Sequence, residues 1–265
     1  MMEWVLGYLA IGAVMGFFAG MLGIGGGALI VPLVTILFQA QELPREHILH
    51  LAVGTAMASV LFTSISSLRA HAARGAVRWE VFRRITPGIL LGGLVGGLIA
   101  GLLPTRWFAV VFTALVYYAA TSMLFDFKPK PSRQLPGRAG MFVAGTLISG
   151  FSALVAIGGA VMSIPLMVFC NVPLVQAIGT AAAIGFPIAL SGTAGYVLTG
   201  WGAAGLPPYS LGYVYLPALV GIILASVFTA PVGAAVAHRV PVRRLRQVVA
   251  VLFYLLATRM LLKLW

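Results

Sequence analysis

The chain has 265 residues, of which 61% are hydrophobic and only 8% are charged, with a net charge of +12. This composition excludes an ordinary soluble domain, in which about a quarter of the residues are charged. Apolar runs of about 20 residues, the length of a membrane-spanning helix, recur along the chain. We therefore predict an all-α polytopic membrane protein that forms a single domain over residues 1–265. The basic residues lie between the apolar runs, which favours a role in membrane orientation over nucleic-acid binding.

The first apolar segment, residues 4–38, is interrupted by glycine and proline. The interrupting residues are Gly23, Gly25, Gly26, Gly27 and Pro32. Glycine weakens a helix and proline removes a backbone donor, so we expect the helix to break here, with Pro32 contributing to the break or hinge. A membrane tolerates such irregular backbone only where protein or a water-filled cavity satisfies the freed polar groups. The sequence leaves open whether this element is a re-entrant hairpin or two full crossings.

Three predicted transmembrane helices complete the first half of the chain, residues 1–125. They cover residues 48–68, 85–103 and 107–125. The first of them carries Thr55, within the triplet Gly-Thr-Ala, and Ser59. The segment 126–138 is basic and rich in proline, which indicates an extended, solvated linker between two halves.

The second half, residues 139–265, repeats this plan. A second Gly–Pro element lies within residues 139–170, and spans follow at 174–198, at 211–236 and near the end of the chain. The second element contains Ser152, Gly158, Gly159 and Pro165, and the next span contains Gln176 and Thr180. Thr180 again lies in a Gly-Thr-Ala triplet. We interpret the two halves as an internal duplication, each with one broken element and three helices.

The distribution of basic residues predicts the orientation of the two halves. Thirteen of the 17 Lys and Arg residues lie in loops 69–84, 126–138 and 238–246, whereas residues 199–210 carry no charge. The positive-inside rule places the three basic loops in the cytoplasm and both chain termini outside it. Corresponding loops of the two halves then lie on opposite sides of the membrane. We therefore predict inverted-topology repeats.

The acidic residues indicate which ligands the membrane interior can bind. All five lie at or near the ends of apolar segments, so no span has a central carboxylate. Because such carboxylates are the usual proton relays and cation ligands, their positions argue against a cation transporter. A broken helix instead presents free amides at a half-helix N-terminus, which bind anions without a basic side chain.

Paired interrupted segments in two halves are typical of a transporter's substrate site. We therefore predict that an anion binds at midplane between the two broken elements. The predicted binding residues are Gly23, Gly25, Gly26, Gly27, Thr55, Ser59, Ser152, Gly158, Gly159, Gln176 and Thr180. Two alternatives stay open: the glycines serve close helix packing, and the hydroxyls bond their own or a neighbouring helix.

Neither a metal site nor an enzyme is predicted. His47 and His50 have a spacing that suits a metal, but they form a single pair near the surface. Four histidines are too few for a membrane di-iron enzyme, and the Ser191 region lacks a later histidine inside the membrane. We expect no cofactor.

Several motifs resemble the sulfite exporter TauE/SafE family over nearly the whole chain. The resemblance rests on the stretches 20–33 and 153–166, the triplets at Gly54 and Gly179, and the loop 74–79. It implies a secondary transporter in the cell (cytoplasmic) inner membrane that exports sulfite, sulfoacetate or related organosulfonates. The alternatives are transport of another small anion or solute, or a non-transporting membrane scaffold. A homo-oligomer is compatible with the sequence.

One departure separates the two copies of the Gly–Pro element. The second copy has Ala156 and Ala160 where the first has Gly23 and Gly27. We therefore expect the two elements to contribute unequally.

Overall fold

The computed structural model describes residues 2–22, 27–125, 132–237 and 242–264. These residues form ten helices and one short antiparallel strand pair, which confirms the predicted all-α membrane protein. The first half contains α1 (Met2–Leu22), α2 (Gly27–Ala40), α3 (Ile48–Ala73), α4 (Trp79–Leu102) and α5 (Thr105–Leu124). The second half contains α6 (Arg138–Val155), α7 (Ala160–Phe169), α8 (Leu174–Gly200), β1 (Ser210–Leu211), β2 (Val214–Tyr215), α9 (Leu216–Ala237) and α10 (Val242–Leu264). Helices α3, α4, α5, α6 and α8 are long and apolar enough to cross a membrane.

Helices α1 and α2 form a hairpin. The Tyr8 hydroxyl lies 2.8 Å from Oε1 of Gln41, which joins the first turns of α1 to the end of α2. A Cβ atom on Gly7 would lie 2.9 Å from Leu37 Cδ2, so the two helices are in close contact along the same region. Helix α2 has 14 residues, which extend about 21 Å and fall short of a hydrocarbon core about 30 Å thick. Helix α2 alone is therefore shorter than a full crossing.

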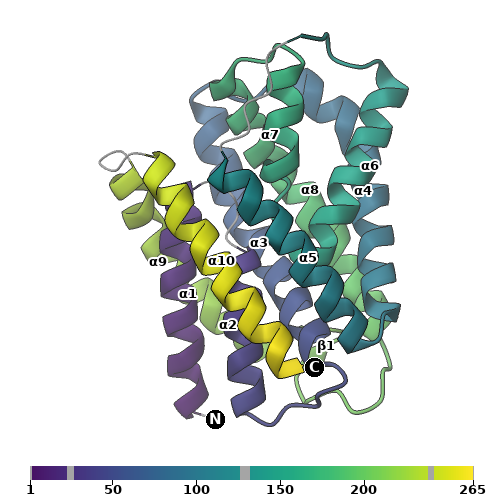
Figure 1. Cartoon of the computed structure of the whole chain (residues 1–265), viewed down its shortest axis with the longest axis vertical. Coiled ribbons are helices and arrows are strands. Elements are labelled where there is room, and N and C mark those ends of the chain that lie inside the picture. Colours follow the sequence, from purple (N-terminus) through teal and green to yellow (C-terminus); the bar gives the residue numbers. More distant parts are fainter. Residues whose placement is uncertain (1, 23–26, 126–131, 238–241, 265) are drawn as a thin grey trace.

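Helices α6 and α7 form a second hairpin at the opposite end of the molecule. The Ser132 and Arg133 amides, which precede α6, both donate to the Phe169 carbonyl at the end of α7, at 3.2 Å. Helix α7 has only 10 residues, or about 15 Å of helix. In Figure 1, α1 begins at the lower end of the molecule, whereas α6 begins at the upper end. The two hairpins thus enter the fold from opposite ends.

Pairs of glycines at matched positions bring helices of the two halves into contact. A Cβ on Gly12 of α1 would lie 2.5 Å from the Ile222 carbonyl oxygen of α9. A Cβ on Gly145 of α6 would lie 2.5 Å from the Ile85 carbonyl oxygen of α4. Small residues allow such close approach of helices in membranes. Gly12 and Gly145, which occupy matched positions in the two Gly–Pro elements, therefore each lie against a helix of the other half.

A reciprocal pair of hydrogen bonds joins α5 and α10. The Tyr117 hydroxyl lies 2.5 Å from Thr258 Oγ1, and the Tyr254 hydroxyl lies 2.5 Å from Thr121 Oγ1. The two tyrosine rings are 4.8 Å apart between centroids. Because each half supplies one tyrosine and one threonine, this exchange is what two related halves facing each other would produce. It supports the proposed duplication of residues 1–125 and 139–265.

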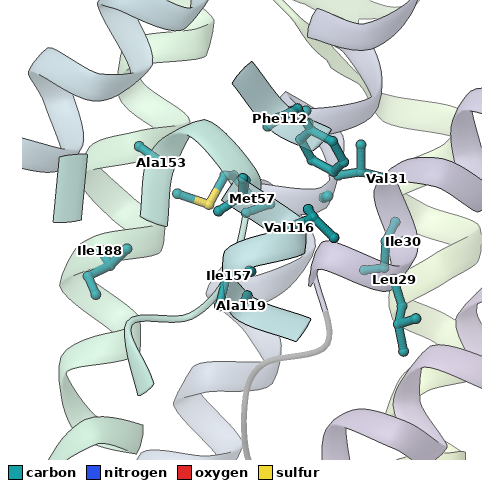
Figure 2. Packing of buried hydrophobic residues seen from close by; sticks show 14 of the residues in the cluster. Leu29, Ile30, Val31, Met57, Phe112, Val116, Ala119, Ala153, Ile157 and Ile188 are labelled. Atoms are coloured by element: carbon teal, nitrogen blue, oxygen red, sulfur yellow. The ribbon is translucent and has the colours of Figure 1, made fainter. Parts of the chain in front are cut away.

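The hydrophobic core surrounds the ends of both hairpins. Figure 2 shows buried side chains gathered from α2 (Leu29, Ile30 and Val31), α3 (Met57), α5 (Phe112, Val116 and Ala119), α8 (Ile188) and the turn after α6 (Ile157). Elements that are distant in sequence therefore fix the hairpin ends in one continuous apolar environment.

Candidate functional site

The two hairpin tips meet inside the protein. Gly27, the first residue of α2, packs against the Ala156 carbonyl oxygen at the end of α6, and a Cβ at position 27 would overlap with that oxygen. The same Cβ would lie 3.0 Å from Val60 Cγ2 of α3. Glycine at position 27 is therefore required for the two tips to touch. Gly23, Gly25 and Gly26, the other predicted binding glycines of this tip, lie outside the described residues.

The tip of the second hairpin is an unusual backbone turn. Ala156 adopts a left-handed conformation with φ of 52°, and Gly159 has φ of 31°. Alanine in this conformation costs about 1 kcal/mol or more relative to glycine, since its Cβ crowds the backbone. The break between α6 and α7 therefore lies at residues 156–159, which include the predicted residues Gly158 and Gly159.

The predicted proline breaks are wrong in position. Helix α2 begins at Gly27 and continues through Pro32, and α7 begins at Ala160 and continues through Pro165. Each proline lies in the second turn, where it removes one backbone hydrogen bond without ending the helix. The second break precedes its proline, because positive-φ backbone ends α6 first.

Carbonyl groups of the tip accept most of the backbone amides at the start of α7. The Met162 and Ser163 amides donate to the Gly159 carbonyl at 3.3 and 2.9 Å. The Ala160 amide donates to the Gly158 carbonyl, which leaves Val161, among the described residues, with the one first-turn amide that has no backbone acceptor outside its own helix. This end of α7 carries partial positive charge, which favours an anionic ligand.

Two of the predicted hydroxyls are buried in the hairpin regions. Ser152 lies in the last turn of α6 and is 2% exposed. Ser59 of α3 donates to its own helix at the Ala56 carbonyl, at 2.7 Å. Ser59 also lines a cavity of about 10 Å³ together with Ile30 and Ser226, which is about the room that one water needs.

Sequence reasoning missed two further hydroxyls. Ser149 of α6 and Ser163 of α7 are fully buried, and their Oγ atoms have no hydrogen-bond partner among the described residues. A signal for Ser163 was present in the two Gly–Pro stretches, because it aligns with Ile30 of the first copy. A polar residue in only one copy, however, leaves no signal of recurrence between the two halves.

Thr55 and Thr180 have matched structural roles instead of meeting at one site. The Thr55 hydroxyl accepts the Tyr215 amide at 2.9 Å, just before α9, and the Thr180 hydroxyl accepts the Arg78 amide at 2.9 Å, just before α4. Both therefore satisfy backbone donors at helix starts, which lack partners within their helices.

The contacts between α3 and α8 also separate these two threonines. A Cβ on Gly192 would overlap with Met57 Cε, whereas a Cβ on Gly185 would lie 3.7 Å from Ser64 Cβ, so α3 and α8 are antiparallel. This register places Thr55 and Thr180 about 20 Å apart along the helix pair. The prediction that they hold one ligand together is not supported by this geometry, so both leave the proposed binding set.

Gln176, another predicted binding residue, lies in the first turn of α8 and is only partly buried. By contrast, Ile184 and Ile188, two to three turns further along α8, lie beside Gly159 at the tip. Gln176 is therefore about 12 Å or more from the tip along the helix.

The carboxylates whose side chains the structure describes lie away from the tips, whereas the Tyr196 hydroxyl donates to the Ala153 carbonyl in the last turn of α6, at 3.0 Å. Glu42, Glu46 and Glu80 are exposed, and Glu80 forms an ion pair with Arg84 at 2.8 Å. Burial raises the pKa of the Cys170 thiol beyond the far end of α7, partly offset by Arg133. In the described residues, the hairpin tips therefore carry helix-end partial charges and hydroxyls as their polar groups.

His47 and His50 make framework contacts. His47 Nε2 lies 3.1 Å from the Ala204 carbonyl oxygen, and His50 Nε2 lies 2.9 Å from the Leu103 carbonyl oxygen. The described residues contain no group of three His, Cys, Asp or Glu side chains that could hold a metal ion.

Comparison with known proteins identifies relatives of this chain. A probable membrane transporter protein of Haemophilus influenzae is 34% identical over 265 residues, covering 99% of this chain and 100% of the relative. Probable membrane transporter proteins of Methanocaldococcus jannaschii and Bacillus subtilis are each 24% identical, covering 90% and 86% of this chain and 88% of each relative. No solved structure matches the chain. The family described as sulfite exporter TauE/SafE matches residues 8–260. This chain therefore belongs to the TauE/SafE family of membrane transporters.

Proposed function

We propose that this chain is a secondary transporter that exports small sulfur-containing anions, such as sulfite, sulfoacetate or related organosulfonates, across the cytoplasmic membrane. The observation that carries this proposal is the contact of two hairpin tips, from opposite ends of the molecule, at Gly27 and Ala156. Paired interrupted helices of this kind form substrate sites in other secondary transporters. Membership of a family described as sulfite exporters supports the substrate class.

The chemistry of the tips suits an oxyanion. The oxygens of sulfite or of a sulfonate group accept hydrogen bonds from amides and hydroxyls, and the positive end of α7 favours their charge. The proposed binding groups are the backbone of Gly27, Gly158 and Gly159 with the Ser59 and Ser152 hydroxyls. Because the described tips hold no carboxylate, we expect coupling through the anion's charge, the membrane potential or protonation of the substrate.

The two hairpins also suit alternating access. Each reaches the interior from one end of the molecule, so movement of one hairpin would open the site toward its own side. We propose that the basic loops 69–84, 126–138 and 238–246 face the cytoplasm, which places the second hairpin on the cytoplasmic side. The chain's termini would then be extracytoplasmic.

Flux into proteoliposomes tests the proposal. Labelled sulfite, sulfoacetate and sulfate are each offered to vesicles containing the native protein, with and without a membrane potential and a pH gradient. We expect saturable, protein-dependent flux of sulfite or a sulfonate that responds to at least one gradient. Absence of flux for all three anions, with folded protein in the vesicles, would contradict the proposal and favour another solute or a scaffold role.

A further inference from the structure

The two hairpins differ at one matched position inside the protein. Position 30 in α2 and position 163 in α7 align when the two Gly–Pro stretches are superposed in sequence, and they carry isoleucine and serine. Both side chains are buried, with Ser163 fully so. The second hairpin therefore brings a hydroxyl into an environment where the first hairpin has only hydrocarbon.

Ser163 shares with Ser149 a fully buried hydroxyl that has no hydrogen-bond partner among the described residues. Ser59, Ser64 and Ser226 each donate to a carbonyl three residues earlier in their own helix, at 2.7, 2.9 and 3.0 Å. The Ser163 hydroxyl has no such bond and no other partner in the described part of the chain. A buried polar group without a partner destabilises a protein, so its presence calls for a ligand or another compensating role.

The position of Ser163 directs its hydroxyl toward the break. Ser163 lies one turn after Gly159 and donates its amide to the Gly159 carbonyl. Side chains of a helix tilt toward its N-terminus, so the Ser163 side chain leans back toward Gly159 and the start of α7. A Cβ on Gly159 would overlap with Ile188 Cδ1, which shows that this face of the tip is enclosed by α8.

We propose that the Ser163 hydroxyl, at the positive end of α7, donates to an oxygen of the transported anion. This inference rests on the proposed function, and it assigns the anion to the second hairpin rather than equally to both. The ligand chemistry is a sulfite or sulfonate group, whose oxygens accept from a hydroxyl and from a helix N-terminus at the same time.

The test compares two buried serines whose hydroxyls both lack a hydrogen-bond partner among the described residues. Ser163→Ala removes the unpaired hydroxyl at the α7 start, and Ser149→Ala removes the unpaired hydroxyl that lies against Gly93 of α4. Both proteins are reconstituted, and the concentration dependence of labelled sulfite and sulfoacetate flux is measured beside thermal unfolding without ligand. Ser163→Cys is measured as well, because the side chain stays nearly the same size while a thiol, which is a weak hydrogen-bond donor, replaces the hydroxyl.

We expect Ser163→Ala to raise KM about tenfold or more, since hydrogen bonds to charged groups are among the stronger ones. Its thermal stability without ligand should be unchanged or raised, and Ser149→Ala should leave KM unchanged. If Ser163→Ala fails to fold, folded Ser163→Cys should still show the raised KM.

Three results would overturn the inference while leaving transport established: a native KM in Ser163→Ala, a native KM in folded Ser163→Cys, or an equal rise in Ser149→Ala. Failure of the native protein to transport either anion would instead refute the proposed function, so the two failures are distinguishable.

Discussion

The hairpin α1–α2 and the hairpin α6–α7 occupy matched places in the two halves but bury different groups. In the first, glycine at position 27 lets the tip touch the opposite tip, and Ile30 adds an apolar face. In the second, a left-handed Ala156 forms the turn, and Ser163 leaves a hydroxyl unpaired. The second hairpin also has the shorter return helix, with 10 residues against 14.

This difference indicates how the two halves divide their tasks. The contacts present in both halves are those of the framework, namely close glycine packing, threonine acceptors at helix starts and the tyrosine–threonine exchange. At the hairpin tips the two halves differ: the left-handed Ala156 and the unpaired Ser163 hydroxyl belong to the second half. We therefore propose that a duplicated framework supports a binding site whose chemistry is concentrated in the second copy.

The largest effect is expected at the contact between the tips. Gly27→Val should lower the free energy of unfolding by about 3 kcal/mol, because its side chain would overlap with the Ala156 carbonyl. Gly150→Ala is the control, since its Cβ would lie 3.5 Å from the Gly92 carbonyl oxygen, an ordinary contact. Thermal unfolding of the solubilised protein measures both. A Gly27→Val protein as stable as native would show that the tips need not touch.

The matched glycine contacts should respond alike. Gly12→Ala and Gly145→Ala each introduce a Cβ 2.5 Å from a backbone oxygen of the neighbouring helix. We expect each to cost about 1–2 kcal/mol, because the helices must move apart to accommodate the methyl group. Thermal unfolding of both variants under identical conditions checks the duplication. Destabilisation by only one of them would argue against equivalent roles in the two halves.

The threonine acceptors should affect stability but not substrate affinity. Thr55→Val and Thr180→Val each leave a backbone amide at a helix start without its acceptor, at a cost of about 1 kcal/mol. Unfolding temperature and the KM for sulfite flux are measured together. A raised KM with unchanged stability would return these threonines to the substrate site.

The smallest effect is expected where α5 meets α10. Tyr117→Phe and Tyr254→Phe each remove one of two reciprocal hydrogen bonds between partly buried groups. Each substitution should lower the free energy of unfolding by about 0.5–1 kcal/mol, and the two losses should be similar. The loss is small because the remaining threonine hydroxyl still bonds its own helix. Chemical unfolding of the two single variants and the double variant gives the coupling. Strongly unequal losses would contradict the symmetry of this contact.

Much of the fold could be predicted from the sequence, because its signals are strong and local. Apolar length predicts the helices, and the repeated Gly–Pro stretches locate the two irregular elements. The prolines were misleading, since α2 and α7 each continue through a proline in their second turn. Hairpin geometry depends on tertiary contacts such as Tyr8–Gln41, which local sequence does not encode.

The candidate site was predicted less completely than the fold. Thr55 and Thr180 were selected because the Gly-Thr-Ala triplet occurs at corresponding positions in both halves. A duplication, however, repeats framework residues as readily as binding residues. Ser163 could not be found by recurrence because its counterpart is Ile30. Whether a buried hydroxyl is paired depends on rotamer and neighbours, so only the three-dimensional structure separates Ser163 from Ser59.

Direct location of a bound anion tests the central claim, that substrate lies at the hairpin tips and mainly at the second. Selenite or selenate replaces the sulfur oxyanion, and anomalous scattering locates the selenium in crystals of the native protein. We predict a peak at the start of α7, near the Ser163 hydroxyl and beside the contact between Gly27 and Ala156. A peak elsewhere in the molecule, or no peak at a concentration that saturates transport, would contradict the account.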